Sequence, residues 1–101
     1  MTNKKYYIRP ANNNDTASSK EVVFTSLMEY GLIPEEFGKD YDLNNIEKHY
    51  FDTHGFFGVL IEADTHEVVG TFGLFSSENA IYELRKIYLT NDFVAKDLEN
   101  Y

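Results

Sequence analysis

The stretch FFGVLIEADTHEVVGTFGLF, residues 56–75, decides the fold of this chain. Its two ends, residues 56–63 and 68–75, are rich in β-branched and aromatic residues, which favour strands. A polar link of four residues, 64–67, joins them and is typical of a hairpin turn. The sequence therefore predicts two consecutive strands joined by a tight turn.

Side chains alternate across the first of these strands. Phe57, Val59 and Ile61 are expected to point to one face of the sheet, and Phe56 and Leu60 to the other. Because both sets are apolar, the pattern predicts that both faces are covered.

The segment upstream predicts a short strand at residues 6–9, followed by a helix at residues 16–30. Asn14 or Asp15 can cap the start of that helix, and Gly31 stands where a left-handed residue ends a helix. The helix carries an apolar stripe made of Val23, Phe24, Leu27, Met28 and Tyr30.

A second helix is predicted at residues 43–51, with Asp42 as its N-cap. Its apolar side consists of Leu43, Ile46 and Tyr50. Beyond the hairpin, residues 81–90 predict a long strand with the apolar anchors Ile81, Leu84, Ile87 and Leu89. Asn91 or Asp92 could then cap a short final helix.

Composition limits the class of protein. The chain has 101 residues, which predicts a single domain over residues 1–101. A net charge of −8 argues against nucleic acid or an anionic membrane as partner. The absence of cysteine excludes thiolate catalysis and thiolate metal sites, and a cytoplasmic location is the default expectation. Three histidines, His49, His54 and His66, lack a spacing that places a third metal ligand, so no metal site is predicted.

Five segments carry a family resemblance, namely residues 7–11 with Asp15, 30–32, 42–50, 68–74 and 83–89. In this order and at these spacings they resemble the GNAT N-acetyltransferases. The resemblance implies an α+β, partial GNAT-like fold: a mainly antiparallel sheet of about four strands, two N-terminal helices and a short C-terminal helix. It also implies acetyl transfer from acetyl-CoA to a small amine.

The same resemblance suggests roles for individual residues. It makes Glu83 the candidate catalytic base, with a cross-strand ion pair or a solvated position as the alternative. It assigns backbone contacts with acetyl-CoA to the end of the fourth strand, and an acceptor pocket to the helical region. The residues concerned are Ile87, Tyr88 and Leu89 for the cofactor, and Tyr30 and Phe37 for the acceptor. The side chains of the first three are expected in the core, and ordinary helix packing explains Tyr30 equally well.

The sequence departs from the family after Phe93. An Arg/Gln-x-x-Gly-x-Gly/Ala turn normally binds the cofactor's diphosphate there, but its glycine positions fall on Ala95, Asp97 and Glu99. One carboxylate about 4 Å from a phosphate, at an effective dielectric constant of about 20, opposes binding by roughly 4 kcal/mol. Lys96 is the remaining cation that could contact the diphosphate. The sequence therefore predicts an impaired cofactor site.

Two alternatives to catalysis stay open. The chain lacks a counterpart of the family's later strands, so it is expected to be a truncated domain that exposes a strand edge and an apolar sheet face near Phe56 and Leu60. Such surfaces favour a non-catalytic interaction module that forms a homo-oligomer. A decayed gene product without selected activity is the other alternative.

Overall fold

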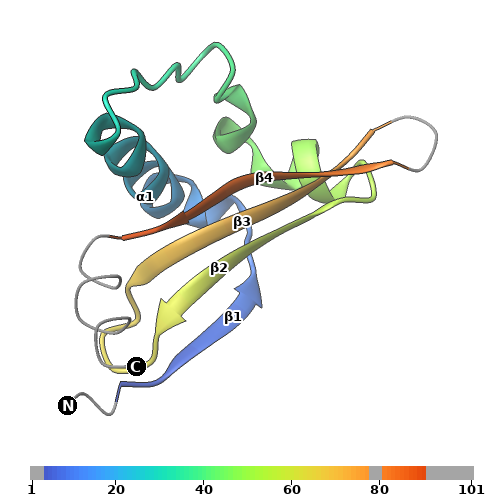
Figure 1. Ribbon diagram of the computed structural model, residues 1–101. Helices are drawn as coiled ribbons and strands as arrows, with labels where there is room; N and C mark the ends of the chain where they lie inside the picture. The colour runs from blue at the N-terminus through green and yellow to red at the C-terminus, as the bar shows by residue number, and fades with distance from the viewer. Residues whose placement is uncertain (1–3, 78–80, 91–101) are drawn as a thin grey trace.

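The computed structural model describes residues 4–77 and 81–90. It contains one antiparallel sheet of four strands in the order β1-β2-β3-β4, with the helical segments on one face (Figure 1). The strands are β1 (Tyr6–Pro10), β2 (Phe56–Glu62), β3 (Val68–Ser76) and β4 (Tyr82–Leu89). The helical segments are η1 (Asn13–Asp15), α1 (Thr16–Glu29), η2 (Tyr41–Asn44) and η3 (Glu47–Phe51). This confirms the α+β class and the meander of β2, β3 and β4.

Helix α1 follows a short 3-10 turn that forms a capping box. The side chain of Asn12 accepts a hydrogen bond from the Asn14 N–H, and the Asp15 carboxylate accepts one from the Asn12 N–H. At the other end, Gly31 adopts a φ of 75° as predicted, and the Leu32 N–H donates back to the Leu27 carbonyl. Within the described ranges, neither α1 nor any other helix is long and apolar enough to cross a membrane.

The second helical region differs from the prediction of one continuous helix. It is a 3-10 turn, η2, and a single π-helical turn, η3, separated at Asn45, whose backbone is extended (φ −153°, ψ 83°). The side chain of Asn45 accepts from the Lys48 N–H and thereby starts the second turn afresh. Asp42 was predicted as an N-cap and this is wrong, because its carboxylate makes no capping bond and is buried beneath the sheet.

The core lies between the sheet and these helical segments. Its fully buried members include Tyr50 from η3 and Phe57 and Val59 from β2. The Tyr50 ring lies against Gly73 of β3, where an added Cβ would stand 2.8 Å from a ring carbon. The predicted inward set of β2 is confirmed, because Phe57, Val59 and Ile61 all belong to the core cluster.

The opposite face of the sheet is more open than expected. The anchors predicted along the fourth strand are exposed: Ile81 by 61%, Leu84 by 65%, Ile87 by 57% and Leu89 by 39%. The outward residues of β2, Phe56 and Leu60, are only half-buried. The prediction of these residues as core anchors was wrong. Ile81 precedes β4, and Leu84 and Leu89 pair with Leu74 and Gly70 on the sheet face that the described helices do not cover. The predicted final helix lies outside the described residues.

Candidate functional site

Strand β4 contains a bulge where it passes the helical segments. Gly73 pairs with Arg85 and Thr71 pairs with Tyr88, so Lys86 and Ile87 together face one residue of β3. Lys86 takes a φ of 57°, in the left-handed region where the first residue of such a bulge is usually glycine. The Thr71 hydroxyl donates to the Lys86 carbonyl at 2.7 Å. The bulge turns both Arg85 and Lys86 towards the helical side.

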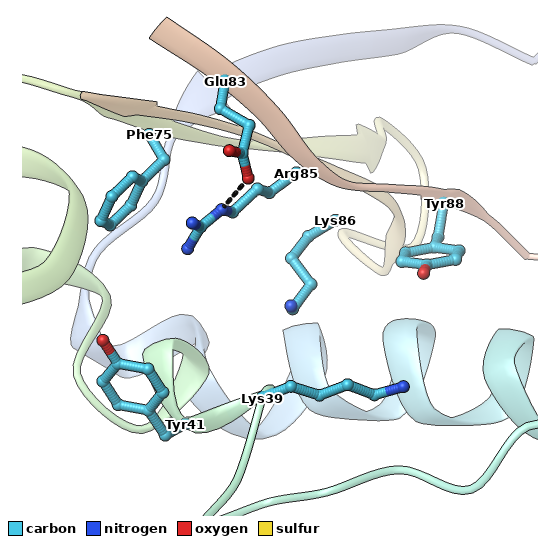
Figure 2. A pocket seen from close by; sticks show the side chains of 7 residues that line it. All are labelled: Lys39, Tyr41, Phe75, Glu83, Arg85, Lys86 and Tyr88. Atoms are coloured by element: carbon cyan, nitrogen blue, oxygen red, sulfur yellow. Dashed lines mark hydrogen bonds and ion pairs between the residues drawn. The ribbon is translucent and has the colours of Figure 1, made fainter. Parts of the chain in front are cut away.

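A hollow of about 510 Å³ lies beside this bulge. Figure 2 shows side chains from β4 on one side of the hollow and those of Lys39 and Tyr41 on the other. The lining residues are Lys39, Tyr41, Phe75, Glu83, Arg85, Lys86 and Tyr88. The hollow therefore has one wall from the sheet and one wall from the loop that enters η2.

Glu83 lies in the hollow as part of an ion pair. Its Oε1 accepts from Nε of Arg85 at 2.6 Å, and the Arg85 guanidinium lies 3.9 Å from the centre of the Phe75 ring (Figure 2). Burial is the largest single influence on the pKa of Arg85 and lowers it, but the hydrogen bond to Glu83 and the charges of Glu83, Tyr50 and Asp42 together raise the pKa overall. The sequence had left open a cross-strand pair or a base for Glu83. The structure pairs it along its own strand, two residues from its partner.

Lys86 forms the second charged group of the site. Its Nζ lies 3.1 Å from Oδ1 of Asp40 and 3.5 Å from Oδ1 of Asp42, and all three side chains are almost fully buried. The Tyr50 hydroxyl donates to the other oxygen of Asp42. Burial, and then this bond to Asp42, raise the pKa of Tyr50, so its phenol stays protonated. Of these groups Lys86 lines the hollow, and the buried Asp40, Asp42 and Tyr50 hold its side chain from behind.

The two acceptor residues suggested by the resemblance lie apart from the hollow. Tyr30 is 79% exposed and Phe37 is 87% exposed, and neither lines it. Of the cofactor residues, Tyr88 lines the hollow and packs partly against the core, whereas the side chains of Ile87 and Leu89 are exposed. The expectation of core positions is therefore wrong for those two side chains, and the role of their backbone stays a prediction. Lys96 and the altered turn lie outside the described residues.

Apart from Arg85, which lies two residues from Glu83 on the same side of the strand, sequence reasoning missed four lining residues, which are Lys39, Tyr41, Phe75 and Lys86. A signal was available for Lys86, since it follows Arg85 directly in β4 and two consecutive residues of a strand point to opposite faces, so one of the two cations was expected on the covered face, where it needs carboxylate partners. The alternating pair Asp40 and Asp42 could have supplied them, but it was interpreted as loop and cap. No comparable pattern marks Lys39 or Tyr41.

Comparison with solved structures identifies the fold. A GNAT-family acetyltransferase from Staphylococcus aureus superimposes with a TM-score of 0.80 at 22% identity, over 95% of this chain and 59% of that one. An acetyltransferase from Streptococcus agalactiae gives 0.73 at 15% identity, over 99% and 60%. One from Trypanosoma brucei gives 0.62 at 15% identity, over 95% and 68%.

The sequence itself is less informative in such comparisons. No protein-family model matches it, and no curated protein is significantly similar to it. The chain spans about three fifths of the length of the first two solved structures that it resembles. Over that length, the chain has the fold of the GNAT acetyltransferases.

Proposed function

We propose that this chain takes part in acetyl transfer from acetyl-CoA to an amine. The observation that carries the proposal is the bulge at Lys86 and Ile87, which lies in an edge strand directly beside the hollow. The fold adds support, because solved proteins with this arrangement are named acetyltransferases.

Strand β4 fits the extended arm of coenzyme A. Among the described residues β4 pairs with β3 alone, so the N–H and C=O groups along its outer side can accept an added strand. The pantetheine arm carries amide groups that match such an edge, and the bound cofactor would supply the activated acetyl thioester. The backbone of Ile87, Tyr88 and Leu89 is the proposed contact. The residues present fit the arm, while the diphosphate end falls outside the described part of the chain.

Glu83 is the proposed base that accepts the proton of the attacking amine. Its side chain is 59% exposed and lines the hollow, so an acceptor molecule can reach it. Arg85 holds one carboxylate oxygen, which fixes the side chain and leaves the other oxygen for the amine or a bridging water.

A titration followed by a turnover assay tests the proposal. Acetyl-CoA is titrated into the protein by calorimetry, and free thiol release is then measured with a panel of small amines. Glu83→Gln is expected to bind acetyl-CoA as the unaltered protein does but to lose about 10²- to 10⁴-fold in kcat. The exposed turn residue Glu67 provides the matched control, because Glu67→Gln should change neither value. No binding heat at millimolar acetyl-CoA would rule out the proposal for this chain.

The acidic residues after β4 provide a separate test of the predicted impairment. If Asp97 and Glu99 oppose the diphosphate, Asp97→Asn combined with Glu99→Gln should tighten acetyl-CoA binding by about tenfold or more. The affinity of the double variant for S-acetylpantetheine, which lacks the diphosphate, should equal that of the unaltered protein. Equal gains for both ligands would mean that the carboxylates act elsewhere.

A second candidate function is a homo-oligomerising interaction module. The observation in its favour is the exposed apolar side chains of Ile8 in β1 and Leu84 in β4, which lie on the sheet face away from the helices with the half-buried Phe56 and Leu60 of β2 between them. Light scattering over a range of protein concentrations measures it. A strictly monomeric chain would remove this candidate, and Leu84→Lys should dissociate any oligomer that uses this face.

A further inference from the structure

Lys86 occupies a backbone conformation that lysine does not favour. Its φ of 57° lies in the left-handed region, where a Cβ crowds the following carbonyl oxygen. Residues held in such conformations persist only when surrounding contacts fix them. The contacts that Lys86 makes are therefore expected to hold the bulge.

The side chain of Lys86 joins two buried carboxylates. Its Nζ lies 3.1 Å from Asp40 and 3.5 Å from Asp42, with side-chain exposures of 11%, 4% and 1% respectively. Oδ1 of Asp42 makes no hydrogen bond within the described residues and relies on this ion pair for compensation. Two buried anions thus depend on one ammonium group, which makes the contact hard to break.

Each carboxylate also holds a further segment. Oδ2 of Asp40 accepts from the Glu35 N–H at 2.9 Å, which closes the loop before η2. Oδ2 of Asp42 accepts from the Tyr50 hydroxyl, which belongs to the core. Lys86 therefore connects the bulge of β4 to the loop and to η3 at the same time.

The loop held in this way forms the second wall of the hollow. Lys39 and Tyr41 flank Asp40 in sequence and line the hollow opposite β4 (Figure 2). Fixing Asp40 to β4 consequently fixes the separation of the two walls. We propose that Lys86 is a positioning residue that sets the distance between the edge of β4 and the wall formed by Lys39 and Tyr41.

This inference deepens the proposed function, on which its catalytic half rests. If β4 presents the acetyl donor, the opposite wall helps to place the acceptor amine, and the Lys86 contact determines how closely the two approach. Misplacement of reacting groups by about 1 Å can cost on the order of 100-fold in rate. The structural half, that Lys86 holds the walls together, needs no cofactor and can be tested first.

Amine labelling of the unaltered protein tests the structural half. Mass spectrometry follows acetylation of each lysine by an N-hydroxysuccinimide ester under native conditions. Lys86 should react at least about tenfold more slowly than Lys39, whose side chain is 54% exposed, because reaction requires the ion pairs to open. Equal rates for the two lysines would overturn the proposal.

Hydrogen exchange of variants tests the same point from the side of the loop. Lys86→Met keeps most of the side-chain length but removes the charge, and Lys5→Met removes an exposed charge as a control. Lys86→Met should speed exchange of the Glu35 and Asp40 amides by about tenfold or more while the β2 amides change much less. Lys86→Arg should recover part of the protection. Unchanged loop exchange in Lys86→Met contradicts the proposal, and if that variant does not fold, the labelling rates decide.

Kinetics then test the catalytic half. Lys86→Met should raise the acceptor KM and lower kcat, each by about tenfold, with partial rescue in Lys86→Arg and no change in Lys5→Met. A chain that binds no acetyl-CoA would end the proposed function yet leave the labelling and exchange results valid. Acetyl transfer with an unchanged acceptor KM in Lys86→Met would instead overturn the positioning role alone.

Discussion

Strands β2 and β4 flank the same neighbour, β3, but they differ in how deeply their residues are buried. Five of the seven residues of β2 are buried, including Phe57 and Val59 at 0% exposure. None of the eight residues of β4 is fully buried, and its apolar Leu84 is 65% exposed. Core packing therefore accounts for the apolar sequence of β2, whereas β4 is distinguished by its position at the edge of the described sheet, its bulge and its charged side chains. The residues that stabilise the fold and the residues proposed for catalysis thus lie on opposite sides of β3.

The largest expected loss of stability comes from creating a cavity beside β2. Phe57→Ala should destabilise the protein by about 3–5 kcal/mol, because the ring is fully buried and contacts Tyr50 at a centroid distance of 5.0 Å. A domain of this size has a total stability of about 5–15 kcal/mol, so the variant should be close to unfolding. Urea denaturation followed by circular dichroism measures the change. A loss below about 1 kcal/mol would mean that β2 is not the packed centre of the fold.

A methyl group added between β3 and η3 should have the next largest effect. In Gly73→Ala the new Cβ would stand 2.8 Å from Cε1 of Tyr50 and 3.1 Å from the Arg85 carbonyl oxygen. Overpacking of this kind costs about 1–3 kcal/mol. Thermal unfolding of this variant beside Gly31→Ala, which meets no atom within 4 Å but has a φ of 75°, separates crowding from backbone strain. Equal stability of Gly73→Ala and the unaltered protein would contradict the close contact on which the position of η3 rests.

The charged pair at the start of α1 should give a pH-dependent effect of about 1–2 kcal/mol. Two nitrogens of Arg9 donate to the two oxygens of Asp15, each at 2.8 Å. This bond lowers the pKa of Asp15 below its usual 3.8, with help from the Asn12 N–H. A lowered folded-state pKa means that the stabilisation is fully present above about pH 4 and is lost as the pH falls through the folded value.

Asp15→Asn provides the measurement for that pair. The variant should be less stable at pH 7, and the difference from the unaltered protein should shrink as the pH is lowered from about 5 to 2. Glu83→Gln, at an exposed pair on β4, should leave stability within about 0.5 kcal/mol. A constant difference between Asp15→Asn and the unaltered protein across this pH range would remove the ion pair as its cause.

The parts of the fold that could be predicted from sequence are those determined by local pattern. The hairpin of β2 and β3, the extent of α1 and the left-handed Gly31 all follow from alternation, helical spacing and glycine chemistry. The interruption at Asn45 could not be predicted in this way. It depends on side-chain bonds to Lys48 and to Asn13, 32 residues away, which compete with the continuous helix that local propensity favours.

The candidate site was only partly predictable for a similar reason. Glu83 and Tyr88 were identified through family resemblance, and both line the hollow. The position of the opposite wall depends on the ion pair between Lys86 and Asp40, which are 46 residues apart in sequence. The bulge that brings them together has no glycine or other turn residue to mark it in the sequence. Because a lysine stands where glycine is the usual choice, local chemistry favoured an unbroken strand. Among the described residues, the ion pairs of Lys86 and the hydrogen bond from the Thr71 hydroxyl to the Lys86 carbonyl hold the observed conformation.

The smallest expected effect on stability comes from shortening an exposed side chain of β4. Leu84→Ala removes a side chain similar in size to those of the core, yet it should change stability by less than about 0.5 kcal/mol, since 65% of the residue already contacts solvent. Urea denaturation of Leu84→Ala and Phe57→Ala at low protein concentration compares β4 and β2 under identical conditions. At high concentration, the Leu84 variant should lose stability only if copies of the chain bury this face against one another. A loss of several kcal/mol in the free energy of unfolding at every concentration would mean that the outer face of β4 is packed within the single chain. The contrast drawn between β2 and β4 would then be wrong.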